Sequence, residues 1–170
     1  NLPGVFESSV AWGDYDNDGD LDILLTGSNG SPSISKIYRN NGDETFTDIN
    51  AELPGVSAGS VAWGDYDNDE DLDILLTGDT SSHVRIARVY RNDSNGSFVD
   101  IHADLTGVMH NSVAWGDYDN DGRLDILLTG YNSSNLPYVS TIYHNNGNDA
   151  FTGINAGLAG VEDSCVAWGD

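Results

Sequence analysis

Apolar and polar residues follow one another along the chain in short runs that predict β-strands. The stretch "SVAW" at residues 9–12 alternates, with Val and Trp on one side and small residues on the other. The stretch "LDILLTG" at 21–27 is an apolar run ended by glycine, which is typical of a strand buried on both faces. "ISKIYRN" at 34–40 and "TFTDI" at 45–49 are rich in β-branched and aromatic residues. No stretch has the helical period of about 3.6 residues, so we expect an all-β fold.

The same series of runs recurs, and the chain is therefore a tandem repeat. The sequence "SVAWGDYDNDGDLDILLTG" begins at Ser9, and near-identical copies begin at Ser60 and Ser112. A shorter fourth copy, "CVAWGD", begins at Cys165. Successive starts differ by 51, 52 and 53 residues. Periods of this length are typical of solenoids and propellers.

Each repeat holds four predicted strands, and four short strands joined as a meander form one blade of a β-propeller. We therefore predict β-propeller blades that are four-stranded antiparallel meanders. The chain, 1–170, is expected to be a single array of three full repeats of about 52 residues plus a partial fourth, at 9–59, 60–111, 112–164 and 165–170. We expect the tryptophans of "AWGD" (Trp12, Trp63 and Trp115) to pack between blades, with Ala11 and Gly13 leaving room for a neighbouring ring.

The variation in repeat length falls in one connection, between the second and third predicted strands. It reads "SNGSPSISK", "DTSSHVRIAR" and "YNSSNLPYVST". In a meander these variable connections lie at the opposite end of the sheet from the connection between the first two strands. Binding residues tend to lie on variable loops over a fixed scaffold. This predicts a ligand face that includes His83, Arg85, Tyr131 and Tyr138. The alternative is that the connections are merely tolerant of change.

The charge is strongly negative and local. The formal net charge is −22, from 28 acidic and six basic residues. Fifteen of the acids lie in three segments, the first (14–22), second (65–73) and third (117–125) acidic loops, with five, six and four acids. Nucleic acid and anionic membranes are therefore poor partners, whereas cations are good ones. No apolar run of about 18 residues is present, so we expect no insertion into a membrane.

Aspartate recurs at positions 1, 3, 5 and 9 of every acidic loop. Alternate spacing in a tight loop turns carboxylates toward one centre, and Ca²⁺ accepts about six to eight such oxygens, at ~2.3–2.6 Å. Zn²⁺ prefers His or Cys, which the loops lack. Position 7 is Asp20, Asp71 or Arg123, and because an arginine side chain cannot bind a cation, we expect the backbone carbonyl to be the ligand there. About three calcium sites are thus predicted, with ligands from Asp14, Asp16, Asp18, Asp20, Asp22, Asp65, Asp67, Asp69, Asp71, Asp73, Asp117, Asp119, Asp121, Arg123 and Asp125.

Position 6 separates the second loop from the others. It is Gly19 in the first loop, Glu70 in the second and Gly122 in the third. Glycine suits a sharp turn with positive φ, so Glu70 predicts a strained or weaker second site. The alternative to calcium is an Asp- and Asn-rich turn without metal, in which the carboxylates would repel one another.

The motif "DYDNDGDLD" followed by an apolar strand, within this β-repeat, resembles the FG-GAP/VCBS repeats, which include the calcium-bearing blades of integrin α-subunit propellers. The resemblance covers essentially the whole chain. It implies a propeller with Ca²⁺ held in the loop between the first and second strands of a blade. It also implies secretion or display at the cell surface, where millimolar Ca²⁺ fits weak sites.

The leading interpretation is a non-enzymatic, extracellular calcium-binding module for adhesion or recognition of a protein or glycan ligand. The alternatives are the propeller domain of a secreted carbohydrate-active enzyme and a structural spacer or filament subunit. Acids outside the loops are scattered, and His83, His102, His110 and His144 do not recur at equivalent positions, so we interpret them as surface residues. Because propellers typically have about four to eight blades, further blades or other copies of the chain are expected partners.

Overall fold

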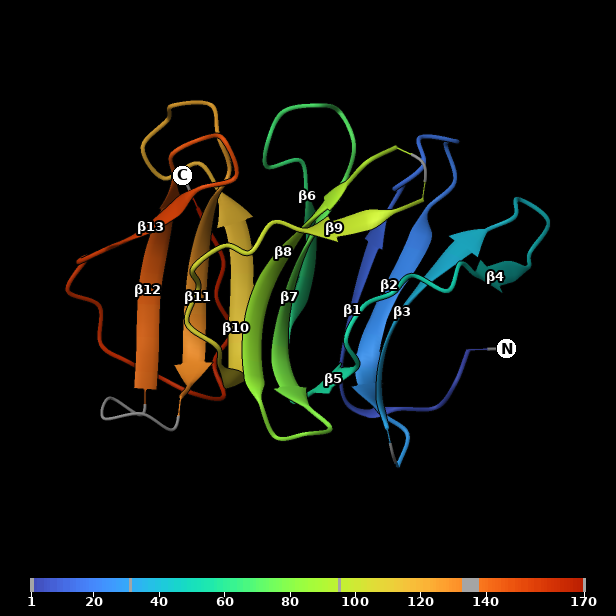
Figure 1. Cartoon of the computed structure of the whole chain (residues 1–170), viewed down its shortest axis with the longest axis horizontal. Helices are drawn as coiled ribbons and strands as arrows, with labels where there is room; N and C mark the ends of the chain where they lie inside the picture. Colours follow the sequence, from blue (N-terminus) through green and yellow to red (C-terminus); the bar gives the residue numbers. More distant parts are fainter. Residues whose placement is uncertain (1, 31, 95, 133–137, 170) are drawn as a thin grey trace.

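The computed structural model describes residues 2–30, 32–94, 96–132 and 138–169, which form thirteen strands and no helix (Figure 1). Residues 133–137 of the third variable connection and Asp170 of the partial repeat lie outside the described residues. The strands are β1 (Phe6–Gly13), β2 (Asp22–Ser28), β3 (Ser33–Asn40), β4 (Phe46–Asp48), β5 (Val56–Ser57), β6 (Val61–Gly64), β7 (Asp73–Thr80), β8 (Arg85–Asn92), β9 (Phe98–Asp100), β10 (Met109–Gly116), β11 (Asp125–Tyr131), β12 (Tyr138–Asn145) and β13 (Phe151–Ile154). The described residues contain no helix long and apolar enough to cross a membrane.

The strands form three antiparallel sheets, and the predicted all-β fold of four-stranded meanders is confirmed. The first sheet has the order β1-β2-β3-β4 and the third the order β10-β11-β12-β13. In the second sheet, β5 and β6 both pair with β7, followed by β8 and β9. Strands β1 and β10 carry a register shift where the second sheet divides into β5 and β6. Strands β5 and β6 together therefore correspond to β1 and to β10, with a larger irregularity between them.

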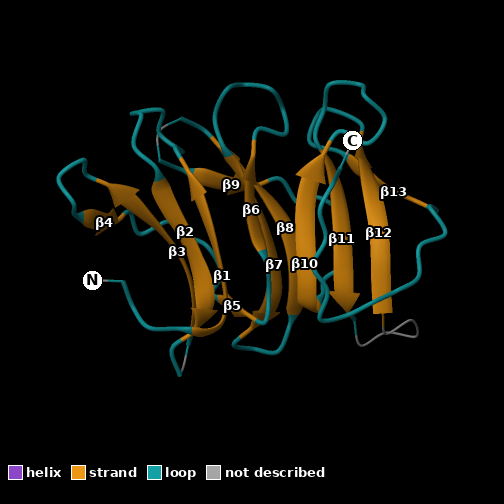
Figure 2. Cartoon of the chain, turned by 180° about the vertical axis from the view of Figure 1, so that it is seen from behind, coloured by secondary structure: helices purple, strands orange, loops and turns teal. Residues whose placement is uncertain are grey.

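The sheets lie side by side, and their connections gather at two ends (Figure 1). The three acidic loops project from one end, at the top of Figure 1, and the β7–β8 connection lies at the other, together with the C-terminal ends of β2 and β11 and the starts of β3 and β12. The view from behind in Figure 2 shows the same separation. The prediction that the variable connections lie opposite the acidic loops is therefore confirmed for the residues that the structure describes.

The hydrophobic core lies between neighbouring sheets. One buried cluster joins Leu24 and Ile37 of the first sheet to Ile74 of the second, and another joins Leu75 of the second sheet to Ile126 of the third. Each sheet therefore depends on its neighbour to cover its apolar face.

Aromatic rings close each junction between sheets. Trp63 stacks on Tyr15 of the first acidic loop, with ring centroids 6.1 Å apart and planes at 9°. Trp115 stacks on Tyr66 in the same way, at 6.2 Å and 10°. A Cβ atom at Gly64 would lie 2.5 Å from the Trp115 ring, so only glycine fits beneath it. The predicted packing of these tryptophans between repeats is confirmed.

Trp12 is the exception, because it packs against no other sheet among the described residues, and the prediction that it packs between blades is therefore not confirmed. Its side chain is 57% exposed, and its ring contact is with Phe46 of its own sheet, at 6.4 Å. The physical reason is that the described residues place no sheet on the outer face of the first one. An apolar face that includes Trp12, Val10 and Phe46 is therefore open to solvent.

Candidate metal centre

The first aspartate of each acidic loop shapes the loop backbone. Asp14 Oδ1 accepts a hydrogen bond from the N–H of Asp18 (3.0 Å), and its Oδ2 accepts one from the N–H of Gly19 (2.9 Å). Asp65 and Asp117 make the equivalent pairs of bonds in the other loops. Each carboxylate oxygen keeps a lone pair after accepting one such bond, so position 1 both folds the loop and stays available as a ligand.

The ninth aspartate is fully buried and joins the loop to the next hairpin. Asp22 accepts hydrogen bonds from the N–H of Tyr15 at Oδ2 (3.2 Å) and from the N–H of Asn40 at Oδ1 (2.7 Å). Asp73 and Asp125 make the same pair of bonds. Their place at the start of β2, β7 and β11 fixes them at the base of each loop.

Carboxylates converge in every acidic loop. In the first loop, oxygens of Asp14, Asp16 and Asp18 lie within 4.8 Å of one another, and in the third loop those of positions 1, 3 and 5 do the same. In the second loop the corresponding group is Asp65, Asp67 and Asp73. Asp22 and Asp69 lie outside these groups. Both accept hydrogen bonds from backbone N–H groups of the loop. The donor set is oxygen-rich and suits a hard divalent cation.

The position-7 side chains of the second and third loops are not members of the converging carboxylate groups and make other contacts. Asp71 accepts a hydrogen bond from Asn17 Nδ2 of the first loop (2.9 Å) and another from the Ser94 hydroxyl. The Arg123 guanidinium pairs with Asp121, and its Nε donates to the carbonyl of Asn145 (2.8 Å). These contacts agree with a backbone rather than side-chain role at position 7.

Position 6 has positive φ in every loop. The φ angles are 94° at Gly19, 73° at Glu70 and 86° at Gly122. A side chain in this left-handed region costs about 1 kcal/mol relative to glycine. Glu70 therefore carries the local strain that the sequence predicts for the second loop.

Burial and crowding raise the pKa values of several loop aspartates. Burial is the main cause at Asp73, whose pKa is raised to about 7 although its carboxylate accepts two backbone hydrogen bonds. Burial also raises the pKa values of Asp22 and Asp125. Burial and then neighbouring carboxylates raise those of Asp16 and Asp67. A bound cation would relieve both effects, because it compensates the negative charge at close range.

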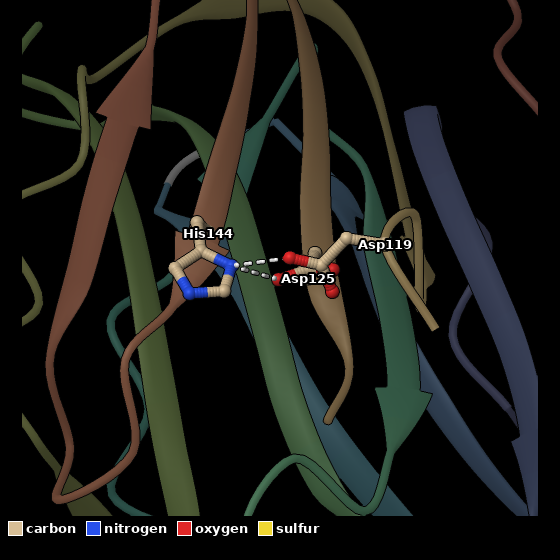
Figure 3. A group of neighbouring side chains, drawn as sticks. All are labelled: Asp119, Asp125 and His144. Carbon is tan, nitrogen blue, oxygen red and sulfur yellow. Dashed lines mark ion pairs between the residues drawn. The ribbon is translucent and has the colours of Figure 1, made fainter. Parts of the chain in front are cut away.

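His144 is a site residue that the sequence analysis missed, and its interpretation as a surface residue is wrong. It is the penultimate residue of β12, next to the third loop, and its Nδ1 faces Asp119 and Asp125 (Figure 3). Its side chain is only 24% exposed. The signal was present in the repeat, because His144 stands where the other repeats have Arg39 and Arg91.

A recurring asparagine, also missed, ties neighbouring sheets together. Asn92 Nδ2 donates to the carbonyl of Tyr15 (2.9 Å), and Asn145 Nδ2 donates to the carbonyl of Tyr66 (2.9 Å). Both asparagines directly follow the tyrosine-and-base pair of the repeat, so alignment of the repeats marks them. The first and second acidic loops are thereby fixed to the sheets that follow them.

At the opposite end, three of the four predicted ligand-face residues come together. The Arg85 guanidinium lies 5.0 Å from the centre of the Tyr131 ring, and the Tyr131 and Tyr138 rings are 6.1 Å apart. Tyr138 is 49% exposed. His83 is not part of this group, because its Nδ1 lies 3.2 Å from Asp79, in a hollow that Ser28 and Ser33 of the first sheet also line.

Comparison with known proteins identifies the repeat. Residues 14–76 and 65–128 each match the model of the FG-GAP-like repeat, and together they cover residues 14–128, which is 115 of the 170 residues. No curated protein and no solved structure matches the chain. The matched segments contain the three acidic loops.

Proposed function

Because the chain belongs to the FG-GAP-like repeat family, we propose that it is an extracellular calcium-binding β-propeller module. It recognises a protein or glycan ligand and has no enzymatic activity. The observation that carries this proposal is the convergence of three aspartates in each acidic loop, with ligand oxygens within 4.8 Å of one another. In this assignment each sheet is one blade.

Calcium fits the donor set of the loops. Carboxylates at positions 1, 3, 5 and 9 and the carbonyl at position 7 offer the hard oxygens that Ca²⁺ prefers. The raised pKa values of Asp16, Asp22, Asp67, Asp73 and Asp125 support the same conclusion, because the loops hold more negative charge than their surroundings stabilise. Bound calcium supplies the missing charge compensation and makes each loop rigid.

A melting experiment tests the calcium assignment. A ligand that binds only the folded state stabilises it by about 2.7 kcal/mol per site at a hundredfold excess over Kd. We expect the melting temperature to rise with millimolar Ca²⁺ and to fall again with chelator. An unchanged melting temperature would remove the calcium assignment.

The Arg85, Tyr131 and Tyr138 group supports ligand binding at the end opposite the loops. An exposed aromatic ring beside a second ring and a guanidinium is typical of recognition surfaces, and such rings stack on sugar rings or on protein side chains. We expect Tyr138→Ala to abolish binding in a glycan array or to a captured protein ligand. Tyr118→Ala, a change to an exposed tyrosine at the acidic-loop end, is the matched control and should leave binding intact.

Two carboxylates outside the loops support a non-enzymatic role. Asp48 lies 2.5 Å from Lys36 Nζ, and Asp100 lies 2.8 Å from Arg88 Nη1, so each is paired with a base on the adjoining strand. A glycoside hydrolase needs two carboxylates that face one substrate about 5–9.5 Å apart. Incubation with polysaccharides of varied composition should release no products. Hydrolysis that Asp48→Asn abolishes would favour the enzyme alternative.

The exposed face around Trp12 supports packing against a further blade, in the same array or in another copy of the chain. Trp12 and Phe46 of this face are equivalent to Trp63 and Phe98 of the second sheet. Those two residues pack against Tyr15 of the first repeat. The measurement is the mass of the chain in solution. If the chain associates and Trp12→Ala removes the association, another copy of the chain covers this face. If the chain is a monomer, a further blade of the same array is the partner that remains.

A further inference from the structure

The third acidic loop differs from the other two in its chemistry. His144 replaces the arginine found in the other repeats as Arg39 and Arg91, and Arg123 replaces the aspartate at position 7. The Arg123 guanidinium pairs with the Asp121 carboxylate, which would otherwise be an oxygen ligand of a calcium site. The third loop therefore loses an oxygen donor and gains an imidazole.

The geometry around His144 is that of a ligand set rather than of a hydrogen bond. His144 Nδ1 lies 3.4 Å from Asp119 Oδ2 and 3.4 Å from Asp125 Oδ1 (Figure 3). The nitrogen is buried and has no hydrogen-bond partner. Hydrogen bonds of this type are about 2.7–3.2 Å long. Two ligands of a tetrahedral Zn²⁺ with bonds of about 2.0–2.1 Å are separated by about 3.3–3.4 Å, which matches the observed spacing.

We propose that the third loop binds a divalent transition-metal ion of the zinc class in place of calcium, through His144 Nδ1, Asp119 and Asp125. Water takes the fourth position, which the partly exposed Asp119 leaves accessible. This inference rests on the proposed function in one respect, that the third loop is a cation site. It does not depend on the first and second loops, which contain no histidine.

The surroundings hold the three ligands in place. Both oxygens of Asp125 accept backbone hydrogen bonds, from Tyr118 and Asn145, so this carboxylate cannot rotate freely. The Tyr118 ring packs edge-on against the His144 ring, with centroids 6.1 Å apart and planes at 87°. Ordered outer contacts of this kind orient metal ligands. Imidazole nitrogen suits Zn²⁺ and its neighbours in the series, whereas Ca²⁺ prefers oxygen throughout.

Cobalt spectroscopy on the full chain tests the proposal. Co²⁺ replaces Zn²⁺ in tetrahedral sites and absorbs visible light much more strongly there than in six-coordinate oxygen sites. In millimolar Ca²⁺, which fills the oxygen cages, we expect one equivalent of strongly absorbing Co²⁺ that Zn²⁺ displaces. His144→Arg restores the side chain of the other repeats and should abolish the band. It should weaken Zn²⁺ binding by more than the roughly 10–100-fold that loss of an outer contact costs.

His83→Arg is the matched control, because His83 also lies near an aspartate but is 89% exposed and far from the third loop. It should leave the band unchanged. Absence of the band in the wild type, or a band that survives His144→Arg, would overturn the proposal and assign His144 to an ion pair with Asp119 and Asp125. A calcium-dependent rise in melting temperature without the band overturns this inference alone, whereas the band without that rise overturns the calcium assignment alone.

Discussion

The first and second sheets carry nearly the same sequence, yet their equivalent residues have different surroundings. Trp12 is 57% exposed, whereas Trp63 stacks on Tyr15 of the neighbouring repeat. Asn92 reaches across to the carbonyl of Tyr15, whereas Asn40 bonds to Leu21 within its own sheet. The second sheet has neighbours on both faces and the first on one. The junction between two repeats, and not the single repeat, is therefore the unit that stabilises this chain.

The largest expected difference concerns the two tryptophans. Trp63→Ala should lower the free energy of unfolding by about 3 kcal/mol, because it removes a large ring from a packed junction. Trp12→Ala should lower it by less than about 1 kcal/mol, because most of its ring is already in water. Urea denaturation of the two variants measures both values. Equal losses would show that the junction has no special importance.

The second difference concerns pH in the presence of chelator. Burial raises the pKa of Asp73 to about 7, above its value of about 3.9 in an unfolded chain. The folded state therefore binds the proton more tightly, so the contribution of Asp73 to stability is complete below about pH 4 and is lost as the pH rises to about 7.

The chelated protein should accordingly be more stable at pH 5 than at pH 8, by on the order of 2–3 kcal/mol from this residue. Asp73→Asn should flatten the dependence, and Asp22→Asn should flatten it less. Thermal or urea unfolding at both pH values measures the slope. A slope that Asp73→Asn leaves unchanged would assign the dependence to other groups.

The third difference concerns the asparagines at the junction. Asn92→Ala should cost about 2 kcal/mol, because it leaves the carbonyl of Tyr15 without its partner in a buried place. Asn40→Ala should cost less than about 1 kcal/mol, since its side-chain amide bonds within its own sheet at a more exposed place. The measurement is again urea denaturation, and an inverted order would contradict the role of Asn92 between sheets.

The smallest effect concerns position 6 of the loops. Glu70→Gly should stabilise the protein by about 0.5–1 kcal/mol, because φ at this residue is 73° and glycine adopts that conformation without strain. The reciprocal change, Gly19→Glu, should destabilise the first loop by a similar amount. Melting curves of Glu70→Gly are measured in saturating Ca²⁺ and in chelator. The backbone effect is the same in both conditions, whereas the effect of the lost carboxylate charge differs between them. A destabilising Glu70→Gly would contradict the strain argument.

Much of the fold follows from the repeat pattern, because strand alternation and turn chemistry are local. The all-β meander, the separation of acidic and variable ends, and the strain at Glu70 were predictable for this reason. That the position-7 side chain is not part of the converging carboxylate groups was also predictable, because Arg123 excludes a side-chain ligand there.

Contacts between repeats were not predictable in the same way. The open face at Trp12 depends on which sheet stands beside it, and Asn92 bonds to Tyr15, a residue 77 positions away in the chain. His144 lies beside Asp119 only because β12 pairs with β11 in this register. Such contacts depend on how residues of different sheets pack together. A single sequence indicates them only where one repeat departs from the others, as where histidine replaces arginine.

The most direct test of the central claim is a count of bound calcium by native mass spectrometry at millimolar Ca²⁺. The structure and its three acidic loops predict three Ca²⁺ ions per chain when no transition metal is present, and two after one equivalent of Zn²⁺ is added. A chain that retains no Ca²⁺ under these conditions would contradict the assignment of the acidic loops as cation sites.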